Sequence, residues 1–150
     1  MREIFSAEEL NYLRSQHLGR MATVQPNGTL QVSPVGFRVD AGTGTIDIHG
    51  YRMAASRKFR NIQDNGRVAF VVDDVPSTDP WRVRCIEIRG TAETIGSGDD
   101  ALIRIHPRRI ISFGIGVGVG VGVGVGVGVG EDLPPHELKP SIRNVQTTAE

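Results

Sequence analysis

The stretch LGRMATVQPNGTLQVSPVGFRVD, residues 18–40, decides the fold class of this chain. Two runs of β-type residues flank Pro26-Asn27-Gly28, and Asn-Gly between such runs is a strong signal for a tight hairpin turn. A second turn at 41–45 and a third extended run at 46–50 follow directly. Because these strands follow one another as hairpins, with no helix between them, the sequence predicts an antiparallel sheet.

Two helices are expected around this hairpin region. Upstream, Ser6 and Glu9 form a capping box at the start of an apolar pattern with helical spacing, which predicts a helix at about 7–16. Downstream, the period changes again, and residues 52–64 form an amphipathic pattern that an Asn-Gly pair closes. The sequence therefore predicts a second helix directly after the third strand.

The second half of the sequence predicts further strands, at 67–74, 81–95 and 101–115. A proline-bounded loop is expected at 75–80, a bend in the following strand at Gly90, and an interruption of the last segment at Pro107. This gives six or seven strands and two helices. The predicted fold is mainly β with α, an antiparallel barrel.

Composition narrows the class of protein. The chain has 150 residues, enough for one domain with a core, and its 17 Lys and Arg balance its 17 Asp and Glu. No net field attracts nucleic acid or a membrane surface, and no apolar run has the length of a membrane span. Cys85 is the only cysteine, and the N-terminal residues do not resemble a secretion signal. A cytoplasmic protein without nucleic-acid or membrane partners is predicted.

Basic residues gather in HGYRMAASRKFRN, residues 49–61, where four Arg and Lys occur without an acidic residue, and Gly50 is expected to allow the tight turn from strand to helix. The N-terminus of a helix presents unpaired amide donors and the positive end of the helix dipole, so this strand-to-helix turn suits the phosphate of a small molecule. A solvated basic helix face is the alternative interpretation. The four histidines show no metal-ligand spacing, and Cys85 lies in an apolar strand, so neither a metal site nor a cysteine nucleophile is predicted.

These segments also resemble a known family. GRMATVQPNGTLQVSPVGF, SRKFRNIQDNGRVAFVVDD and IRGTAE occur in the order found in the pyridoxamine 5'-phosphate oxidase-like superfamily of flavin and deazaflavin proteins, the FMN-binding split β-barrels. The likeness spans residues 5–115 and is nearest to the actinobacterial branch that uses coenzyme F420. PWRVRCIEIRGTAE and ALIRIHPRRIISFGI resemble a subgroup that includes a reductase of tetracycline biosynthesis.

The resemblance implies a cofactor site and a homodimer with two sites at its interface. The cofactor phosphate is expected at the start of the second helix and at the strand end before it, and the cofactor ring is expected above the second strand. Trp81 is expected to reach the site from the partner subunit; the alternative interpretation is an aromatic residue packed at the edge of the barrel. The implied cofactor-binding residues are Gln31, Val32, Ser33, Pro34, Val35, His49, Gly50, Arg52, Ser56, Arg57, Lys58 and Trp81. No catalytic side chain is assigned, because hydride transfer from a cofactor requires neither a nucleophile nor a metal.

The function implied is F420-dependent reduction of an unsaturated or quinone-like small molecule, of the kind found in antibiotic biosynthesis. Two alternatives stay open: an FMN-dependent oxidase or reductase on the same barrel, and a flavin- or deazaflavin-binding protein without catalysis.

A strict Gly-Val repeat follows the family-like part of the chain. It occupies 116–130, and alternation of this kind is compatible with a flexible connection or with an edge strand. Since SIRNV at 141–145 resembles the C-terminal tail of the family, the repeat is interpreted as an insertion. The predicted organisation is a cofactor-binding domain at 1–115, the insertion, and an arm of the same domain at 131–150.

Overall fold

The computed structural model describes residues 3–116 and 140–146, and these form a curled antiparallel sheet with two α-helices. The helices are α1 (Ala7–Ser15) and α2 (Arg57–Asn65), with short 3₁₀ turns η1 (Met53–Ala55) and η2 (Gly98–Asp100). The strands are β1 (Leu18–Val24), β2 (Leu30–Gly36), β3 (Arg38–Asp40), β4 (Thr45–Ile48), β5 (Arg67–Thr78), β6 (Trp81–Ile95), β7 (Leu102–Phe113) and β8 (Ser141–Asn144).

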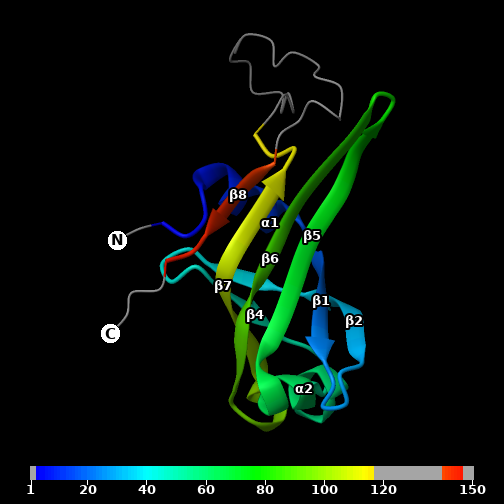
Figure 1. Ribbon diagram of the computed structural model, residues 1–150, viewed down its shortest axis with the longest axis vertical. Coiled ribbons are helices and arrows are strands. Elements are labelled where there is room, and N and C mark those ends of the chain that lie inside the picture. Colours follow the sequence, from blue (N-terminus) through cyan, green and yellow to red (C-terminus); the bar gives the residue numbers. More distant parts are fainter. Residues whose placement is uncertain (1–2, 117–139, 147–150) are drawn as a thin grey trace.

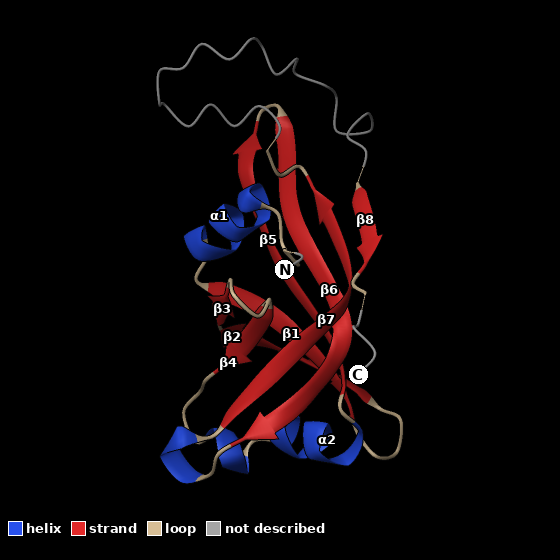
Figure 2. Ribbon diagram, turned by 90° about the vertical axis from the view of Figure 1, so that its left-hand side faces the viewer, coloured by secondary structure: helices blue, strands red, loops and turns tan. Residues whose placement is uncertain are grey.

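The sheet has the order β2-β1-β5-β6-β7-β4-β3, and β8 pairs with β7 beside this path. Every pairing is antiparallel. Figure 2 shows the long strands crossing the length of the molecule, with α1 against the upper part and α2 at the lower end. The predicted split-barrel fold, mainly β with two helices, is confirmed, and the described residues hold eight strands instead of six or seven.

The first hairpin follows its sequence signal. β1 and β2 pair from Leu18↔Gly36 to Val24↔Leu30, so the turn lies where Asn27-Gly28 was expected to place it. Gly28 has φ of 88°, a left-handed conformation that glycine adopts without strain. The α1 capping box is also present: the Ser6 hydroxyl accepts from the Glu9 amide, and the Glu9 carboxylate accepts from the Ser6 amide.

The expected loop at 75–80 is wrong, because β5 continues to Thr78 and β6 starts at Trp81. Pro76 fits within the strand because the register of the two strands shifts between Asp74 and Ser77, and a bulge does not require the N–H that proline lacks. Only the Asp79-Pro80 turn separates the strands. The result is a long hairpin that projects beyond the rest of the sheet (Figure 1).

The expected interruption at Pro107 is also wrong, whereas the bend at Gly90 is confirmed. The β6–β7 register passes from Arg89↔Arg109 to Gly90↔Pro107, so Arg108 is the extra residue of a bulge and β7 is continuous. A Cβ at Gly90 would lie 2.1 Å from the carbonyl oxygen of His106, and therefore only glycine fits at this bend.

The second helix begins later than the expected residue 52. Ser56 has extended backbone angles and caps α2, so residues 53–55 form the separate turn η1. Phe59 and Ile62 are buried and form the apolar face of α2, whereas Ala55, within the range expected to be helical, lies outside the helix and is exposed. Gly66 ends the helix with φ of 67°, as the Asn-Gly signal predicted.

The core lies between the concave side of the sheet and the two helices. Its fully buried aliphatic and aromatic side chains come mainly from the central strands: Ile46, Ile48, Phe70, Val72, Ile86, Ile88, Ile103, Ile105 and Ile110. Leu13 of α1 and Phe59 of α2 cover the two ends of this core. Residues 117–139, which include nearly all of the Gly-Val repeat, lie outside the described residues.

Candidate functional site

The start of α2 combines free amide donors with unpaired cations. Ser56 is the N-cap, and its hydroxyl oxygen accepts from the Phe59 amide, which leaves the amides of Arg57 and Lys58 without an intrahelical partner. The first turn contains no acidic residue. Among the residues described, none forms an ion pair with Arg57 or Lys58. This donor set suits an anion such as a phosphate monoester or diester.

The hydroxyl of Ser56 forms two hydrogen bonds within the turn. It donates to the carbonyl oxygen of Met53 at 2.6 Å while it accepts from the Phe59 amide. The hydroxyl proton is therefore used within the turn, and the donors left for an anion are the backbone amides and the cationic side chains. Arg57 is tethered, since its Nη2 donates to Oε1 of Gln25 at 3.2 Å.

The tight turn before the helix is made at Arg52 and not at Gly50. Arg52 has φ of 52°, the only positive φ among the non-glycine residues that the structure describes. It is the N-cap of η1, and its side chain is exposed. A left-handed backbone conformation is unusual for an arginine, because glycine adopts it with less strain. His49 and Gly50 are exposed residues that follow β4.

The five candidates on β2 lie on two faces of the strand. Val35 is buried and Val32 is 68% exposed, so alternation places the first, third and fifth candidates on the inner face and the other two on the outer face. The inner residues are Gln31, Ser33 and Val35, and the outer residues are Val32 and Pro34. One flat ring cannot contact both sets from one side. The strand nevertheless lies at the edge of the sheet, where it pairs with β1 on one side.

The inner face of β2 is joined to α2 by a residue that the sequence reasoning missed. Asn61 of α2 is completely buried, and its Nδ2 donates to Oγ1 of Thr23 at 3.0 Å and to Oε1 of Gln31 at 3.2 Å. Asparagine is a poor helix former, so its place in the middle of an amphipathic helix is a signal that could have identified it.

At the other end of β2, His49 lines a pocket of about 280 Å³ together with Gly36, Phe37 and Arg38. Phe37 packs edge-on against Phe70 of the core, with ring centroids 5.4 Å apart. The candidates near His49 and those near Gln31 thus lie at opposite ends of one edge strand. The segment 49–58 connects these two ends through η1 and the start of α2.

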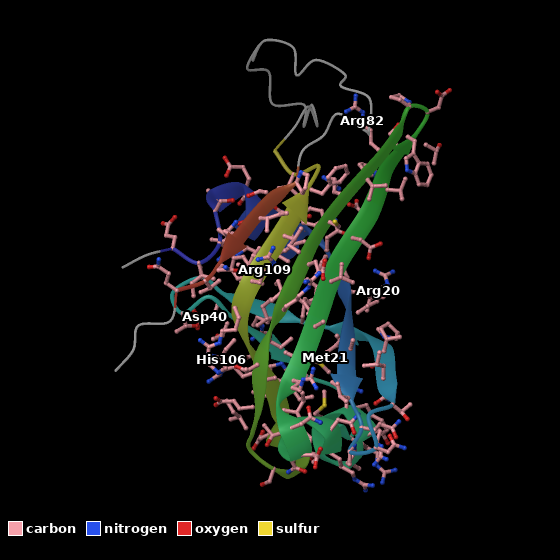
Figure 3. The ribbon with its side chains drawn as sticks, in the orientation of Figure 1. Arg20, Met21, Asp40, Arg82, His106 and Arg109 are labelled. Carbon is pink, nitrogen blue, oxygen red and sulfur yellow. The ribbon has the colours of Figure 1, made fainter. Side chains whose placement is uncertain are left out.

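Trp81 is not brought together with the other candidates within one chain. It is the first residue of β6, at the tip of the projecting hairpin, and 53% of its surface is exposed. Figure 1 shows this tip at the opposite end of the molecule from α2, and Figure 3 labels its neighbour Arg82 there. Within the chain, eleven of the twelve candidates border β2, the end of β4 and the start of α2.

The charged groups at the α1 end of the molecule are paired instead. Glu9 is 3% exposed and forms an ion pair with Arg143 of β8, whose Nη1 lies 3.1 Å from Oε2. Burial acts to raise the pKa of Glu9, but the hydrogen bonds and charge of Arg143, together with the Ser6 amide, outweigh it and leave the pKa below its usual value.

A second closed network joins α1 to the long hairpin. The hydroxyl of Tyr12 donates to Oδ1 of Asp74 at 2.9 Å, and Arg84 binds the same carboxylate through two nitrogens at 3.0 and 2.6 Å. The Arg84 hydrogen bond lowers the pKa of Asp74, while burial and the carboxylate raise the pKa of Tyr12. Burial, with Asp73 and Glu87 nearby, raises the pKa of the Cys85 thiol, which opposes a nucleophilic role.

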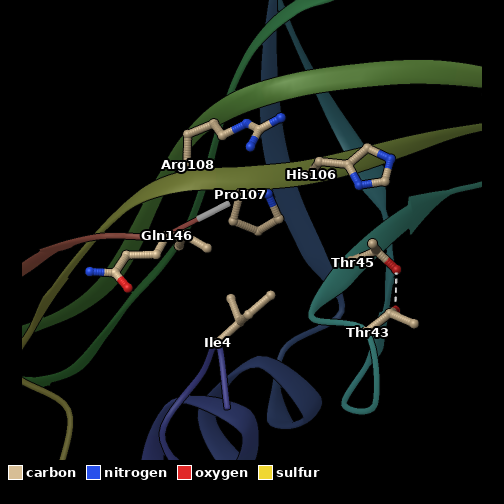
Figure 4. Close-up of a pocket in the computed structure, with 8 residues that line it drawn as sticks. Ile4, Thr43, Thr45, His106, Pro107, Arg108 and Gln146 are labelled. Atoms are coloured by element: carbon tan, nitrogen blue, oxygen red, sulfur yellow. Dashed lines mark hydrogen bonds between the residues drawn. The ribbon is translucent and has the colours of Figure 1, made fainter. Parts of the chain in front are cut away.

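Figure 4 shows a different pocket, of about 280 Å³, which contains none of the predicted site residues. Its lining comes from the N-terminal segment, the β3–β4 turn, β7 and the residues after β8: Ile4, Thr43, Thr45, His106, Pro107, Arg108, Val145 and Gln146. His106 is directed to Glu93, with Nε2 and Oε2 3.0 Å apart.

No helix in the described part of the chain is long and apolar enough to cross a membrane.

Comparison with known proteins agrees with this geometry. Residues 5–112 match the family described as pyridoxamine 5'-phosphate oxidase. A curated relative from Streptomyces rimosus, a 5a,11a-dehydrotetracycline/5a,11a-dehydrooxytetracycline reductase, is 50% identical in an alignment 119 residues long, and the match covers 74% of this chain and 84% of the relative.

Solved structures share the fold at lower identity. A conserved hypothetical protein from Mycobacterium tuberculosis matches with a TM-score of 0.60 and 20% identity, over 73% of this chain and 85% of that one. The FAD binding protein from Mycobacterium smegmatis matches with a TM-score of 0.53 and 24% identity, over 72% of this chain and 93% of that one. The family resemblance inferred from the sequence is confirmed: the chain belongs to the pyridoxamine 5'-phosphate oxidase-like family of split β-barrels.

Proposed function

We propose that this protein is an F420-dependent reductase of an unsaturated small molecule of the tetracycline type. The observation that carries the proposal is the 50% identity to a dehydrotetracycline reductase over most of both chains. A cytoplasmic location is part of the proposal, as is the division into a cofactor domain at 1–115, an insertion at 116–130 and an arm at 131–150.

The start of α2 fits the phosphodiester of the cofactor. The amides of Arg57 and Lys58 are free of intrahelical partners, no carboxylate lies in the first turn, and the two side chains add positive charge. We assign the phosphate to this turn, with Arg52 as a further cation beside it. The neutral composition of the whole chain means that this local charge, and not a global field, selects the anion.

When bound in its reduced form, the deazaflavin supplies a hydride to an electrophilic carbon. The work of the protein is to bind, to orient and to exclude water. Lys58 and the α2 amides hold one end of the cofactor, while the inner face of β2, with Gln31 and Ser33, fixes the ring against the sheet edge. Holding both reactants in one geometry is itself a large part of the rate enhancement that such a site can provide.

FMN is the second candidate cofactor, because the same phosphate site would accept its phosphate monoester. A protein that binds either cofactor without turnover is the non-catalytic alternative. The residues of the α2 turn are equally suited to both phosphates, so the discrimination must come from the ring side of the site.

We propose that the protein acts as a homodimer. Leu30 and Val32 lie two residues apart on the outer face of β2 and expose 75% and 68% of their surface. Large exposed aliphatic residues on one sheet are typical of an interface. Trp81, distant from the other candidates in its own chain, would then complete the site of the partner.

The oligomeric state is measured by sedimentation velocity. Wild type is expected to sediment as a dimer, and Val32→Glu, which places a charge on this face, as a monomer with an intact fold by circular dichroism. A wild type that remains monomeric at tens of micromolar would contradict the dimer and the role of Trp81, but would leave the assignment of the phosphate to the start of α2 unchanged.

The function is tested by a reduction assay with 5a,11a-dehydrotetracycline as substrate. Reduced F420 and reduced FMN are supplied separately, and the oxidation of each is followed by absorbance. Turnover with reduced F420 alone supports the proposal, and turnover with FMN alone replaces F420 by FMN. Binding of a cofactor without turnover, for this substrate and a panel of enones and quinones, would favour the non-catalytic alternative.

A further inference from the structure

Asn61 joins three elements at one point of the candidate site. It lies in the second turn of α2, and its amide nitrogen donates to Thr23 of β1 and to Gln31 of β2. Thr23 and Gln31 are themselves opposite each other in the β1–β2 register. Asn61 is 0% exposed and Thr23 is 1% exposed, so water does not compete for this contact.

This arrangement leaves one buried atom without a partner. Among the described residues, Oδ1 of Asn61 is the buried side-chain oxygen or nitrogen that has no hydrogen-bond partner. A buried unpaired polar atom destabilises a fold, and an apolar side chain would avoid that loss. The packing of α2 therefore does not by itself explain why an asparagine occupies this position.

The hydrogen bonds fix which way the Gln31 amide points. Because Nδ2 of Asn61 donates to Oε1 of Gln31, the Gln31 nitrogen is directed away from Asn61. Reversing Gln31 alone would set two donors against each other. Reversing both amides would leave two N–H groups of Asn61 unpaired in place of one oxygen, and unpaired buried N–H groups are the rarer arrangement.

Gln31 consequently presents two N–H donors at the inner face of the edge strand. Its side chain is half-buried, and its Nε2 has no partner among the residues that the structure describes. Donors in this position complement an acceptor, such as a ring carbonyl oxygen, especially one that gains negative charge during reduction.

We infer that Asn61 is a positioning residue that orients Gln31 as a hydrogen-bond donor to a carbonyl oxygen of the ring bound at β2. This inference rests on the proposed function, because it requires a ring at that edge strand. The carbonyl belongs to the pyrimidinedione of the cofactor or to the substrate. Asn61 acts through Gln31 and does not touch the ligand.

The test is a double-mutant cycle with Asn61→Ala, Gln31→Ala and both together, read as the dissociation constants of F420 and FMN by fluorescence titration. Each single variant is expected to weaken binding about threefold to tenfold, the value of one hydrogen bond. If Asn61 acts through Gln31, its substitution has no further effect once Gln31 is alanine. Effects that multiply fully would overturn the inference.

Asn65→Ala is the matched control. Asn65 lies on the same helix, and its Nδ2 donates to the carbonyl oxygen of Val24 at 2.7 Å without touching Gln31. This variant removes a comparable α2–β1 contact, so it should lower the urea midpoint and leave the dissociation constants unchanged. Equal weakening by Asn65→Ala and Asn61→Ala would reduce Asn61 to a structural role.

Gln31→Glu keeps the inference testable even if Asn61→Ala does not fold. Glu retains the acceptor for Asn61 and replaces the donor by a carboxylate oxygen, so binding should weaken more than with Gln31→Ala. Wild-type affinity for the cofactor together with a wild-type KM for the substrate in Gln31→Glu would contradict the inference.

The two sources of the carbonyl are separated by the ligand that responds. Weaker binding of the cofactor, with a shifted absorption band of the bound ring, places the carbonyl on the cofactor. Unchanged cofactor binding with a raised KM for 5a,11a-dehydrotetracycline places it on the substrate. If wild type binds neither cofactor, the proposed function fails and the inference with it; if wild type binds and the Gln31 and Asn61 variants match it for cofactor and substrate, the inference fails alone.

Discussion

The two α-helices of this protein begin in nearly the same way and differ in what surrounds the first turn. Both are capped by a serine, Ser6 in α1 and Ser56 in α2. The first turn of α1 carries Glu8 and Glu9, whereas that of α2 carries no acid and begins with Arg57 and a lysine. The acidic residues of α1 thus complement the positive end of its helix dipole, whereas the first turn of α2 contains no negative charge.

The difference shows where binding capacity remains. Around α1, the buried carboxylate is matched by Arg143, and the neighbouring Asp74 is matched by Arg84 and Tyr12. Around the start of α2, the cations have no ion-pair partner within the described residues. The charged groups at the α1 end form ion pairs that stabilise the fold. The cations at the start of α2 have no such partner and can bind an anionic ligand.

Making α2 resemble α1 should have the largest effect. Ser56→Asp keeps an N-cap acceptor for the Phe59 amide, loses the hydrogen bond that the serine hydroxyl donates to Met53, and adds a carboxylate at the proposed phosphate position. At about 5 Å and an effective dielectric constant near 20, the repulsion is about 3 kcal/mol, which weakens cofactor binding about a hundredfold. Isothermal titration calorimetry measures the affinity.

The matched control is Ser6→Asp, the same change at the cap of α1. It should leave the dissociation constant of the cofactor unchanged. Cofactor binding that survives Ser56→Asp would show that the phosphate does not lie at α2.

Removing the cation of the paired end should affect stability and not binding. Arg143→Ala leaves Glu9 buried without its partner, which we expect to lower the free energy of unfolding by about 2 to 3 kcal/mol, because Arg143 is partly exposed. Urea denaturation measures this change. Asn144→Ala, which removes the neighbouring exposed contact with Arg109, serves as the control and should change the midpoint little. A large loss of cofactor affinity in Arg143→Ala would contradict the separation of the two ends.

The pH dependence of stability also tests the pairing of Glu9 with Arg143. The pKa of Glu9 is lowered in the folded protein, so its contribution is present above the usual value of 4.5 and is lost as the pH falls through the folded pKa. In Arg143→Ala, burial should raise the pKa of Glu9 instead, and that variant should gain relative stability on acidification. Urea midpoints from pH 7 to pH 3 measure the two slopes, and parallel slopes would refute the pairing.

The smallest effect is expected from the Gly-Val repeat. Its flanks are held together, because Ser112 of β7 is opposite Ser141 of β8. Deleting residues 117–130 roughly halves the connection, and loop-closure entropy then changes stability by only about 0.6 kcal/mol, in favour of the folded state. Thermal unfolding and a cofactor titration measure the variant. A deletion that folds but no longer binds would assign the repeat to the site.

Local signals predicted those parts of the fold that a few neighbouring residues determine. The Asn27-Gly28 hairpin and the Ser6 capping box each depend on contacts within three or four residues. Pro76 and Pro107 misled the prediction because a bulge is a relation between two strands, and only the partner strand shows that a proline fits. The register of β5, β6 and β7 was not visible from the sequence.

The site divides in the same way. The basic start of α2 was visible, because charge and capping are local. The contacts of Asn61 with residues 38 and 30 positions away, and the pairing of Glu9 with Arg143 across 134 positions, come from the topology of the sheet. The left-handed backbone at Arg52, expected at Gly50, also depends on how η1 packs before α2.

If the start of α2 holds the phosphate of F420, the loss of its lysine should weaken cofactor binding, and a titration measures this. Purified wild type, Lys58→Ala and Arg14→Ala, a cation lost from the last turn of α1, are each titrated with F420 under identical salt. We expect saturable binding by wild type and Arg14→Ala, and affinity at least about tenfold weaker for Lys58→Ala, because a charge-assisted hydrogen bond is lost. Equal affinity of all three proteins, or no saturable binding by wild type, would contradict this assignment.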